Sequence, residues 1–190
     1  MRMSSQDKRK QLIDAAYNVF VNRGYANASV KDIAQEAGIT AGLVHYYFKS
    51  KEDLLISVQN EVQKQYQIQY DGWRNDDSLT PAKVLLEIKS RAESNPDWYR
   101  WRYEIYSLAL KNDRLKQEAA TILRSGRDSL SEPLTHLAVQ PATADALAGV
   151  LLACFDGLAL QKILDDRFDL DGAYQVLLEC LDAYLRRGET

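Results

Sequence analysis

The feature that most constrains the fold is residues 24–54, where two short helices are predicted on either side of a tight turn. The segment reads GYANASVKDIAQEAGITAGLVHYYFKSKEDL. Ser29 and Asp32 have the spacing of a capping box, which starts a helix. Gly38 then ends that helix, because glycine readily adopts the left-handed backbone of a tight turn. Two helices joined by AGIT over residues 37–40 have the length and chemistry of a helix-turn-helix.

The rest of the chain also reads as successive helices. Only nine Gly and four Pro are present, and no turn dipeptide separates alternating apolar runs, so signals for strands are weak. The residues expected as helix N-caps are Ser29, Thr40, Ser50, Thr80 and Asp171, with Asn112 or Asp113 before the seventh helix. We therefore predict an all-α fold of nine helices, with a polar loop over residues 72–78. The predicted helices cover residues 6–23, 29–37, 41–47, 50–73, 80–95, 98–110, 112–137, 141–166 and 171–188.

Apolar residues at helical spacing predict a small core beneath the helix-turn-helix. Ala34 is small where two helices must approach closely. The expected core residues are Leu12, Ile13, Ala16, Phe20, Ile33, Ala34, Val44 and Phe48.

The distribution of charge along the chain predicts an anionic partner for its first quarter. The formal net charge of -3 disfavours a nucleic-acid binder when taken alone. Residues 1–51, however, hold eight Lys and Arg against four Asp and Glu, whereas residues 52–190 hold sixteen against twenty-three. A basic segment on an otherwise acidic chain indicates a partner of its own. The run Lys8-Arg9-Lys10 is either a solvated tail or an arm along a DNA backbone.

Several other classes of protein are excluded by residues that are few or badly placed. Cys154 and Cys180 are the only cysteines, so we expect a reduced, cytoplasmic protein without disulfides. No apolar signal region follows the first residues. The most apolar stretch, residues 146–164, is interrupted by Asp156 and Lys162, which predicts a buried helix and no membrane partner.

The sequence also offers no basis for catalysis or metal binding. His45 and His136 are the only histidines and lie in different segments, so a metal site lacks ligands. No phosphate-binding glycine loop or nucleophile elbow is present. We expect no cofactor, no metal and no catalytic residues, and a helical enzyme is the weaker hypothesis.

The second helix of the motif carries the residues expected to contact DNA. In a helix-turn-helix, the N-terminal end of this helix meets the major groove. Ala41 and Gly42 are small enough for the backbone to approach the bases, and Leu43 suits a thymine methyl group. The residues expected to hold phosphates are Thr40, His45, Tyr46 and Lys51, together with Ser29 at the start of the preceding helix.

These residues resemble the TetR family of one-component bacterial transcription regulators. The resemblance rests on Phe20, on the pair GY at 24–25 and on three segments: SVKDIA at 29–34, AGI at 37–39 and GLVHYYFKSKEDL at 42–54. It covers about the first 55 residues. Many members have Tyr at the position of His45 and His at the position of Tyr47.

The resemblance implies a two-part organisation. Residues 1–50 would form the DNA-binding domain, and residues 51–190 would bind a ligand and dimerise. The implied function is a homodimeric repressor that binds a palindromic double-stranded DNA operator and is released by a small-molecule effector. A transcriptional activator, or a ligand-independent regulator of the same fold, is the alternative. A helical adaptor that binds protein is disfavoured by the basic first segment.

The last two helices carry the residues expected at a dimer interface. Gly149, Ala153 and Gly157 are four residues apart, so they share one helix face and would let a second helix approach closely. The ninth helix has a wider apolar face than one buried stripe requires. The alternative is that both helices only complete the core of one chain. The ninth-helix residues expected at the interface are Leu177, Leu181 and Tyr184.

An aromatic-rich sixth helix, WYRWRYEIY over residues 98–106, is the expected wall of an effector pocket. Trp and Tyr provide large apolar surfaces with polar edges. Glu104 or Asp156 would suit a cationic effector, whereas Arg102 would suit an anion, and the sequence leaves both open. The alternative is an aromatic core without a ligand. The expected effector contacts are Trp98, Trp101, Arg102, Tyr103, Tyr106, Phe155 and Asp156.

Overall fold

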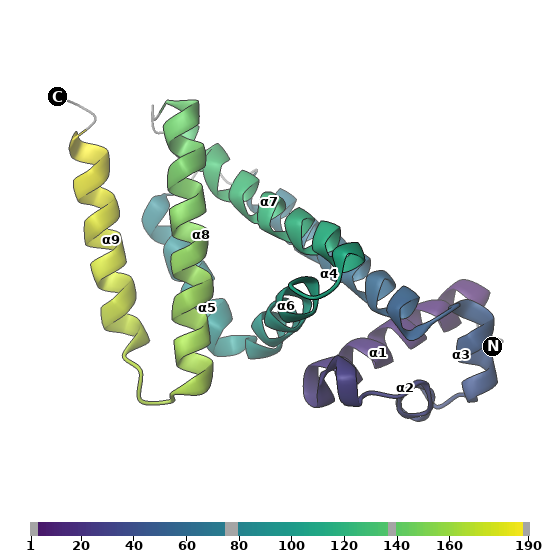
Figure 1. Ribbon diagram of the computed structural model, residues 1–190. Helices are drawn as coiled ribbons and strands as arrows, with labels where there is room; N and C mark the ends of the chain where they lie inside the picture. The colour runs from purple at the N-terminus through teal and green to yellow at the C-terminus, as the bar shows by residue number, and fades with distance from the viewer. Residues whose placement is uncertain (1–3, 75–79, 137–139, 188–190) are drawn as a thin grey trace. The chain divides into compact units, whose positions relative to one another are not determined.

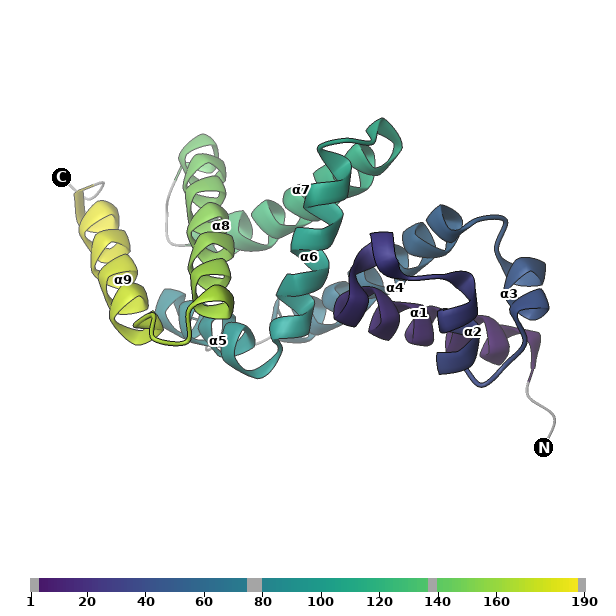
Figure 2. The same cartoon turned by 60° about the horizontal axis from the view of Figure 1, so that its bottom comes forward.

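The computed structural model describes residues 4–74, 80–136 and 140–187, and within these ranges the chain forms nine α-helices and no strand (Figures 1 and 2). The predicted all-α fold is confirmed. The expected helix ends at Leu137 and Gly188, and most of the expected loop at 72–78, lie outside the described residues. The helices are α1 (Ser5–Asn27), α2 (Val30–Glu36), α3 (Ala41–Tyr47), α4 (Lys51–Arg74), α5 (Pro81–Ser94), α6 (Pro96–Ala109), α7 (Asp113–His136), α8 (Pro141–Leu164) and α9 (Leu170–Arg187).

Four of the six predicted N-caps, those at Ser29, Ser50, Thr80 and Asn112, make the expected side-chain hydrogen bond. Ser29 forms a reciprocal capping box with Asp32, and the Thr80 hydroxyl accepts a hydrogen bond from the Lys83 amide at 3.3 Å. Two predicted caps are corrected. Thr40 occupies the N-cap position of α3, but its side chain makes no cap hydrogen bond.

The cap predicted at the start of α9 is also wrong in position. The Gly172 amide donates to Asp169 Oδ1 at 2.9 Å, so Asp169 caps the helix in place of Asp171. Asp171 lies in the first turn of α9 and forms an ion pair with Lys89. Two acidic residues so close together are both plausible caps in the sequence, and only the backbone conformation distinguishes them.

The chain divides into two compact units. Unit 1 contains residues 1–69 and 100–119, and unit 2 contains residues 70–99 and 120–190. The division falls inside α4, α6 and α7, so it differs from a single division of the sequence near residue 50. A functional boundary at that position stays a prediction.

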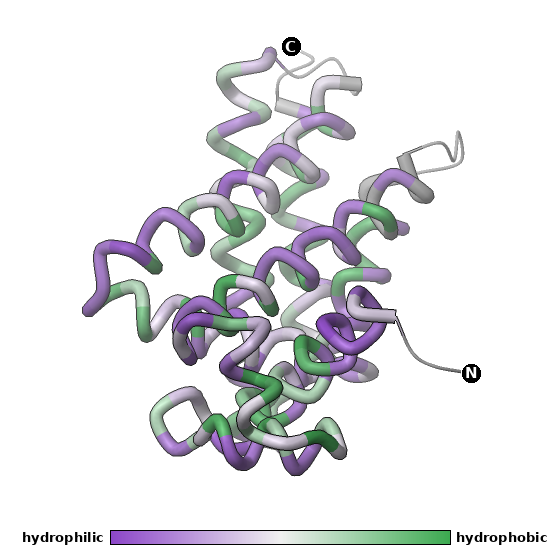
Figure 3. Tube along the Cα trace, turned by 90° about the vertical axis from the view of Figure 1, so that its right-hand side faces the viewer, coloured by the Kyte–Doolittle hydropathy of each residue, from purple (hydrophilic) through white to green (hydrophobic). Residues whose placement is uncertain are grey.

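The core of unit 1 confirms the predicted apolar pattern. All eight residues expected beneath the helix-turn-helix are buried. Leu54, Leu55 and Val58 from α4 are fully buried as well. Short hydrophilic and hydrophobic segments alternate along most of the chain trace (Figure 3), as expected for helices that bury one face.

Unit 2 packs α8 against α5 and α9, and α8 and α9 lie side by side (Figures 1 and 2). Phe155 of α8 stacks on Tyr174 of α9, with ring centroids 6.0 Å apart and planes 7° apart. Gly126 of α7 faces Leu152 of α8, where an added Cβ would lie 3.1 Å from the leucine methyl carbons. A larger residue at this position would require the Leu152 side chain to shift by a few tenths of an ångström.

Helix α8 is the most apolar of the long described helices, although Asp156 and Lys162 interrupt it. Among the described helices, it alone has the length and hydropathy of a membrane-spanning segment, with a mean hydropathy of 1.7 over 18 residues. Only 22% of that window is buried. The sequence predicts a buried helix over residues 146–164. Within one chain, this helix is buried only in part, and one side of it is exposed.

Candidate nucleic-acid interface and effector site

The turn between α2 and α3 has the backbone that the sequence predicts. Gly38 adopts a φ of 64°, in the left-handed region that favours glycine. The Gly38 amide donates to the Gln35 carbonyl at 3.1 Å, and the Ile39 amide donates to the Ala34 carbonyl at 2.9 Å. These bonds satisfy carbonyls at the end of α2 and fix the direction in which α3 leaves the turn.

The outer face of α3 presents the residues expected to contact DNA. Thr40, Gly42, His45 and Tyr46 are exposed, and Tyr46 is 77% exposed. Val44 and Phe48 lie on the opposite, buried side. Ala41 and Leu43 are half-buried. The helix therefore combines a firmly packed inner face with an outer face of small and hydrogen-bonding residues.

Gly42 has no packing role inside unit 1. A Cβ added there would meet no atom within 4 Å, and its backbone is helical. Glycine is unfavourable in a helix relative to alanine. The flat surface at this position therefore suits close approach by an external molecule.

Ser29 is exposed, but its hydroxyl is occupied by the capping box of α2. Ser29 Oγ donates to Asp32 Oδ2 at 2.5 Å and accepts from the Asp32 amide at 3.1 Å. The hydrogen bonds from the Ser29 side chain and backbone hold the pKa of Asp32 below its ordinary value. A phosphate at this helix start would thus meet the backbone amides of α2 more readily than the Ser29 hydroxyl.

Lys51 points into unit 1 in this structure. Its Nζ donates to the Tyr25 carbonyl at 2.7 Å and to the Ala28 carbonyl at 2.8 Å. It also lies 4.2 Å from the centroid of the Tyr25 ring. The side chain expected to hold a phosphate thus contacts the backbone that connects α1 to α2.

The basic run at residues 8–10 belongs to α1, so it is not a tail. Ser4 caps this helix through a capping box with Asp7, which starts the helix before the basic run. Arg9 donates to Ser57 Oγ at 3.1 Å and lies over the Phe48 ring at 5.0 Å. Lys10 forms ion pairs with Asp14 and with Glu61 of α4.

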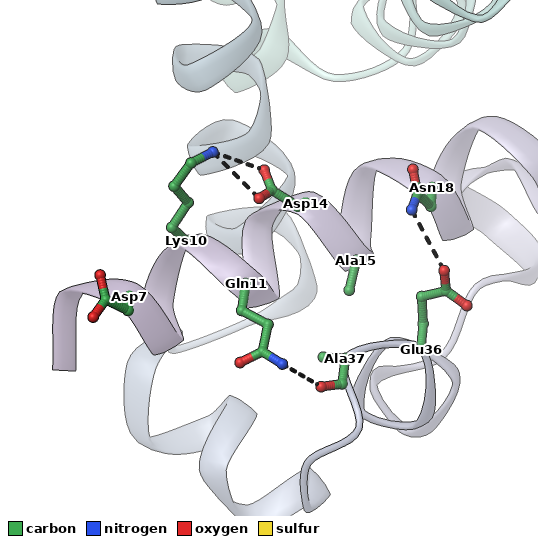
Figure 4. Close-up of a pocket in the computed structure, with 8 residues that line it drawn as sticks. All are labelled: Asp7, Lys10, Gln11, Asp14, Ala15, Asn18, Glu36 and Ala37. Carbon is green, nitrogen blue, oxygen red and sulfur yellow. Dashed lines mark hydrogen bonds and ion pairs between the residues drawn. The ribbon is translucent and has the colours of Figure 1, made fainter. Parts of the chain in front are cut away.

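A depression of about 390 Å³ lies between α1 and the end of α2 (Figure 4). Gln11 Nε2 donates to the Ala37 carbonyl at 2.8 Å, and Asn18 Nδ2 donates to Glu36 Oε1 at 3.4 Å. The first bond satisfies a carbonyl at the C-terminus of α2. The Gln11 bond joins the end of α2 to α1, whereas the longer contact between Asn18 and Glu36 is exposed and weak. None of the expected effector contacts lines this depression.

The expected effector residues do not all lie in one unit. Trp101, Arg102, Tyr103 and Tyr106 belong to unit 1. Trp101 is fully buried, and its indole nitrogen donates to Gln59 Oε1 at 2.8 Å. Its ring lies 5.6 Å from that of Tyr17 and 6.2 Å from that of Phe20. Trp101 therefore belongs to the core beneath the helix-turn-helix.

The neighbouring residues of α6 are also packed within unit 1. Arg102 is buried, and its guanidinium lies 5.4 Å from the centroid of the Tyr106 ring. Tyr103 and Tyr106 are half-buried. Glu104 accepts a hydrogen bond from the Tyr25 amide at 2.5 Å, so this carboxylate already has a partner in unit 1.

Unit 2 contains the other three expected effector residues. Trp98 is half-buried and makes an edge contact with the Tyr99 ring at 4.8 Å. Phe155 is buried against Tyr174, and Asp156 is half-buried.

Glu87 of α5 is a half-buried acid in unit 2 that sequence reasoning missed. Arg91 Nε donates to Glu87 Oε1 at 2.7 Å, and the Arg91 guanidinium lies 5.8 Å from the Trp98 ring. Glu87 Oε2 is buried without a hydrogen-bond partner among the described residues. Burial raises the pKa of Glu87, and the hydrogen bond from Arg91 opposes that rise.

An apolar surface runs along α8 and α9. Ala153 and Gly157 lie on it, and no atom comes within 4 Å of a Cβ built on Gly157. Gly149 differs from them, since its Cβ position is 3.6 Å from Arg127 of α7. The exposed apolar residues that sequence reasoning missed are Val150, Leu160 and Leu164 on α8 and Val176 on α9.

The three residues of α9 expected at the interface differ in exposure. Tyr184 is 51% exposed, Leu177 is half-buried, and Leu181 is buried within its own chain. Leu181 thus completes the core of one chain, as the alternative hypothesis held for it. The missed α8 residues recur with Ala153 and Gly157 every three or four positions, a signal that could have identified them.

Two family models match this chain. Residues 12–58 match "Bacterial regulatory proteins, tetR family". Residues 82–186 match "BetI-type transcriptional repressor, C-terminal".

Individual relatives match over nearly the full length. The HTH-type transcriptional regulator PksA of Bacillus subtilis is 27% identical over 189 residues, which cover 96% of this chain and 92% of PksA. The HTH-type nicotine-responsive transcriptional repressor HdnoR of Paenarthrobacter nicotinovorans is 29% identical over 195 residues, which cover 98% of each chain.

Solved structures share the fold. A TetR transcription regulator from Haloarcula marismortui matches with a TM-score of 0.80 and 24% identity, covering 94% of this chain and 98% of that one. A transcriptional regulator from Saccharomonospora viridis, solved in complex with choline, matches with a TM-score of 0.71 and 22% identity, covering 94% and 97%.

Proposed function

Because the chain belongs to the TetR family of transcriptional regulators, we propose that it is a repressor that binds a two-fold symmetric operator as a homodimer. We further propose that a small organic cation releases it from DNA. The family is one of DNA-binding regulators. The repressing role, the operator symmetry, the dimer and the effector chemistry are the proposed parts.

The outer face of α3 is the observation that carries the DNA-binding part of the proposal. Its exposed residues are small or hydrogen-bonding, and Gly42 leaves room for close approach. In a helix-turn-helix, residues at this end of the second helix read base edges, while flanking polar side chains hold phosphates. Thr40, His45 and Tyr46 are the proposed phosphate contacts, and Ala41, Gly42 and Leu43 are proposed to lie against the bases.

The exposed apolar surface of α8 and α9 supports the homodimer. Soluble monomers rarely expose large continuous apolar patches, and a second copy would bury Val150, Ala153 and Gly157 against their own equivalents. An isologous interface of this kind relates the two α3 helices by a two-fold axis. Two such helices match an operator whose half-sites are inverted repeats.

Residues of unit 2 support a cationic effector. Glu87 has one buried carboxylate oxygen that accepts no hydrogen bond from the described residues, and Arg91 already places a cation near the Trp98 ring. A carboxylate and an indole face are two chemical groups that attract organic cations. Trp98, Phe155 and Asp156 are the proposed effector contacts, together with Glu87. Two of the matching proteins support an organic cation as effector: one is named as nicotine-responsive, and the other was solved in complex with choline.

Release requires the effector to prefer a conformation that fits DNA poorly. Shifting a two-state protein from about 1:99 to 99:1 needs a preference of about 10⁴-fold. An effector that binds both conformations equally would leave DNA binding unchanged.

The test uses the full-length chain and a duplex selected by that chain from random double-stranded DNA. Binding is measured by fluorescence anisotropy while choline, nicotine and other small organic cations are added, with matched neutral and anionic compounds as controls. We expect at least one cation to weaken binding, and Glu87→Gln to abolish that response while keeping the DNA affinity. If only anions release the DNA, the cationic effector is refuted.

Repression and activation are separated by a reporter gene placed behind the selected duplex. Expression of the chain is expected to lower transcription, and the effector is expected to restore it. A rise in transcription on expression of the chain would instead show an activator.

A further inference from the structure

Helix α1 is kinked at Gly24, and the segment from there to α2, residues 24–28, is here called the α1–α2 connection. Two charged side chains of opposite sign hold it. Gly24 has a φ of 73°, in the left-handed region that disfavours other residues. The Ala28 amide closes the connection by donating to the Gly24 carbonyl at 3.2 Å. Ser29, the N-cap of α2, follows directly. The conformation of residues 24–28 therefore sets where α2 begins.

Glu104 of α6 binds the first peptide of this connection. Its Oε1 accepts a hydrogen bond from the Tyr25 amide at 2.5 Å. The same oxygen lies 3.7 Å from the position of a Cβ on Gly24. The left-handed residue thus turns the next amide toward a carboxylate on a helix distant in sequence.

Lys51 of α4 binds the carbonyls of the same connection. Its Nζ is 2.7 Å from the Tyr25 carbonyl and 2.8 Å from the Ala28 carbonyl. The Tyr25 ring lies beneath the ammonium at 4.2 Å. Each charge therefore faces the end of the peptide dipole that it stabilises, and hydrogen bonds to charged groups are stronger than neutral ones.

These contacts reach α3 through α2. The Gln11 side chain fixes the C-terminus of α2 on α1, and the bonds of the Gly38 turn fix α3 on α2. With α2 held at both ends, a change in the connection at residues 24–28 would move α2 and the α3 helix attached to it.

We propose that Glu104 and Lys51 are positioning residues for DNA recognition: they clamp the α1–α2 connection and thereby orient α3. The clamp rests on the proposed function of α3 as the DNA-reading helix. In this role, Lys51 acts through the protein backbone and makes no contribution as a phosphate contact.

The negative charge of Glu104 distinguishes a positioning role from a general electrostatic effect on DNA binding. DNA is a polyanion, so loss of a nearby carboxylate should tighten binding if only the net charge mattered. A positioning role for Glu104 predicts the opposite, because its loss frees the connection.

The experiment compares Glu104→Ala, Glu104→Gln and Lys51→Ala with a matched control, Glu36→Ala. Glu36 is an exposed acid of unit 1, and within the described part of the chain its side chain makes one weak contact, with Asn18 at 3.4 Å. Hydrogen–deuterium exchange of the Tyr25 amide is measured in the DNA-free full-length chain. Affinity for the selected duplex is measured over a series of salt concentrations, after thermal unfolding has confirmed that each variant is folded.

We expect Glu104→Ala to accelerate exchange of the Tyr25 amide and to weaken DNA binding about tenfold, the scale of one charge-assisted hydrogen bond. Glu104→Gln should keep most of the affinity, since its amide oxygen still accepts from the Tyr25 amide. Lys51→Ala should weaken binding with an unchanged salt slope. Glu36→Ala should leave exchange unchanged and should not weaken binding.

Three results would overturn the proposal. Unchanged exchange in Glu104→Ala shows that no clamp exists, even if no DNA is bound at all. DNA binding that is equal or tighter in Glu104→Ala removes the positioning role. A salt slope lowered by about one in Lys51→Ala shows a phosphate contact.

Failure of the wild-type chain to bind any duplex refutes the proposed function, while the exchange measurement still tests the clamp. If Glu104→Ala does not fold, Lys51→Ala tests the clamp alone: it should accelerate exchange of the Tyr25 amide and weaken DNA binding with an unchanged salt slope.

Discussion

The exposed faces of α3 and of the α8–α9 pair differ in chemistry, although both belong to helices with a well-packed inner side. On α3, the exposed residues are small or hydrogen-bonding, such as Gly42 and Tyr46. On α8 and α9 they are apolar, as Val150 and Val176 show, each 59% exposed.

This difference indicates two different partners. Polar and small groups that leave the backbone accessible suit a hydrated, charged surface such as DNA. Apolar groups in a continuous stripe suit a second protein surface that excludes water. The partner of each face can therefore be inferred from what the chain leaves unburied.

The largest expected effect comes from a charge on the apolar face. Ala153→Glu would place an unpaired carboxylate in the proposed interface twice per dimer. Each uncompensated buried charge costs about 3–5 kcal/mol. We expect monomers in light scattering. We also expect a loss of operator affinity of about 10²-fold or more, because the two α3 helices are no longer linked in one dimer.

A matched variant on the polar side of α9, Gln175→Glu, adds the same charge and should remain dimeric. A stable dimer of Ala153→Glu would show that the apolar face has another partner.

Trp101→Ala should weaken the α3 region by removing the core beneath it. Replacement of a buried Trp by Ala costs about 3–5 kcal/mol, measured here by urea unfolding. Trp98→Ala should lower the free energy of unfolding by less, because Trp98 is only half-buried. Self-association through α8 and α9 should be unchanged in both. A Trp101→Ala chain as stable as the wild type that no longer responds to effector would make Trp101 an effector contact.

Gly42→Ala should separate stability from DNA binding. The added methyl group meets no protein atom within 4 Å, and alanine in a helix is favoured over glycine by about 0.5–1 kcal/mol. We expect a higher unfolding temperature together with DNA binding weakened about tenfold, since overpacking of a close interface costs about 1–3 kcal/mol. Unchanged DNA affinity would show that this face does not approach the bases closely.

The smallest effect is a pH dependence from Glu87. Its pKa in the folded chain is raised above the ordinary value of 4.5 by burial. The folded state therefore binds a proton more readily than the unfolded state, and the free energy of unfolding should fall as pH rises from about the ordinary value through the folded pKa. Glu87→Gln should remove that part of the pH profile. An identical profile in the variant would show that the carboxylate is not shielded from water.

Most of the helix-turn-helix could be predicted because its signals are local, although Thr40 does not cap α3 through its side chain. Ser29 with Asp32, and Gly38 with its left-handed turn, specify backbone conformation over a few residues. The burial of Val44 and Phe48 follows from helical periodicity. None of these features depends on distant parts of the chain.

The site residues of α6 could not be assigned in the same way. Trp98 and Trp101 share one helical face, yet only the tertiary structure places Trp101 against Gln59 and Phe20. Lys51 has the chemistry of a phosphate ligand, and only the fold shows that two carbonyls bind its ammonium. Glu104 is half-buried and accepts a hydrogen bond from the Tyr25 amide, a partner distant in sequence that helical spacing alone does not indicate.

The most direct test is the composition of the complex with DNA. The full-length chain is mixed with random double-stranded DNA, the bound duplexes are sequenced, and the mass of the complex on an enriched duplex is determined by light scattering. We predict inverted half-sites and two chains on each duplex, with both features lost in Ala153→Glu. A single half-site bound by one chain, or no enriched sequence, would contradict a two-fold symmetric operator read by paired α3 helices.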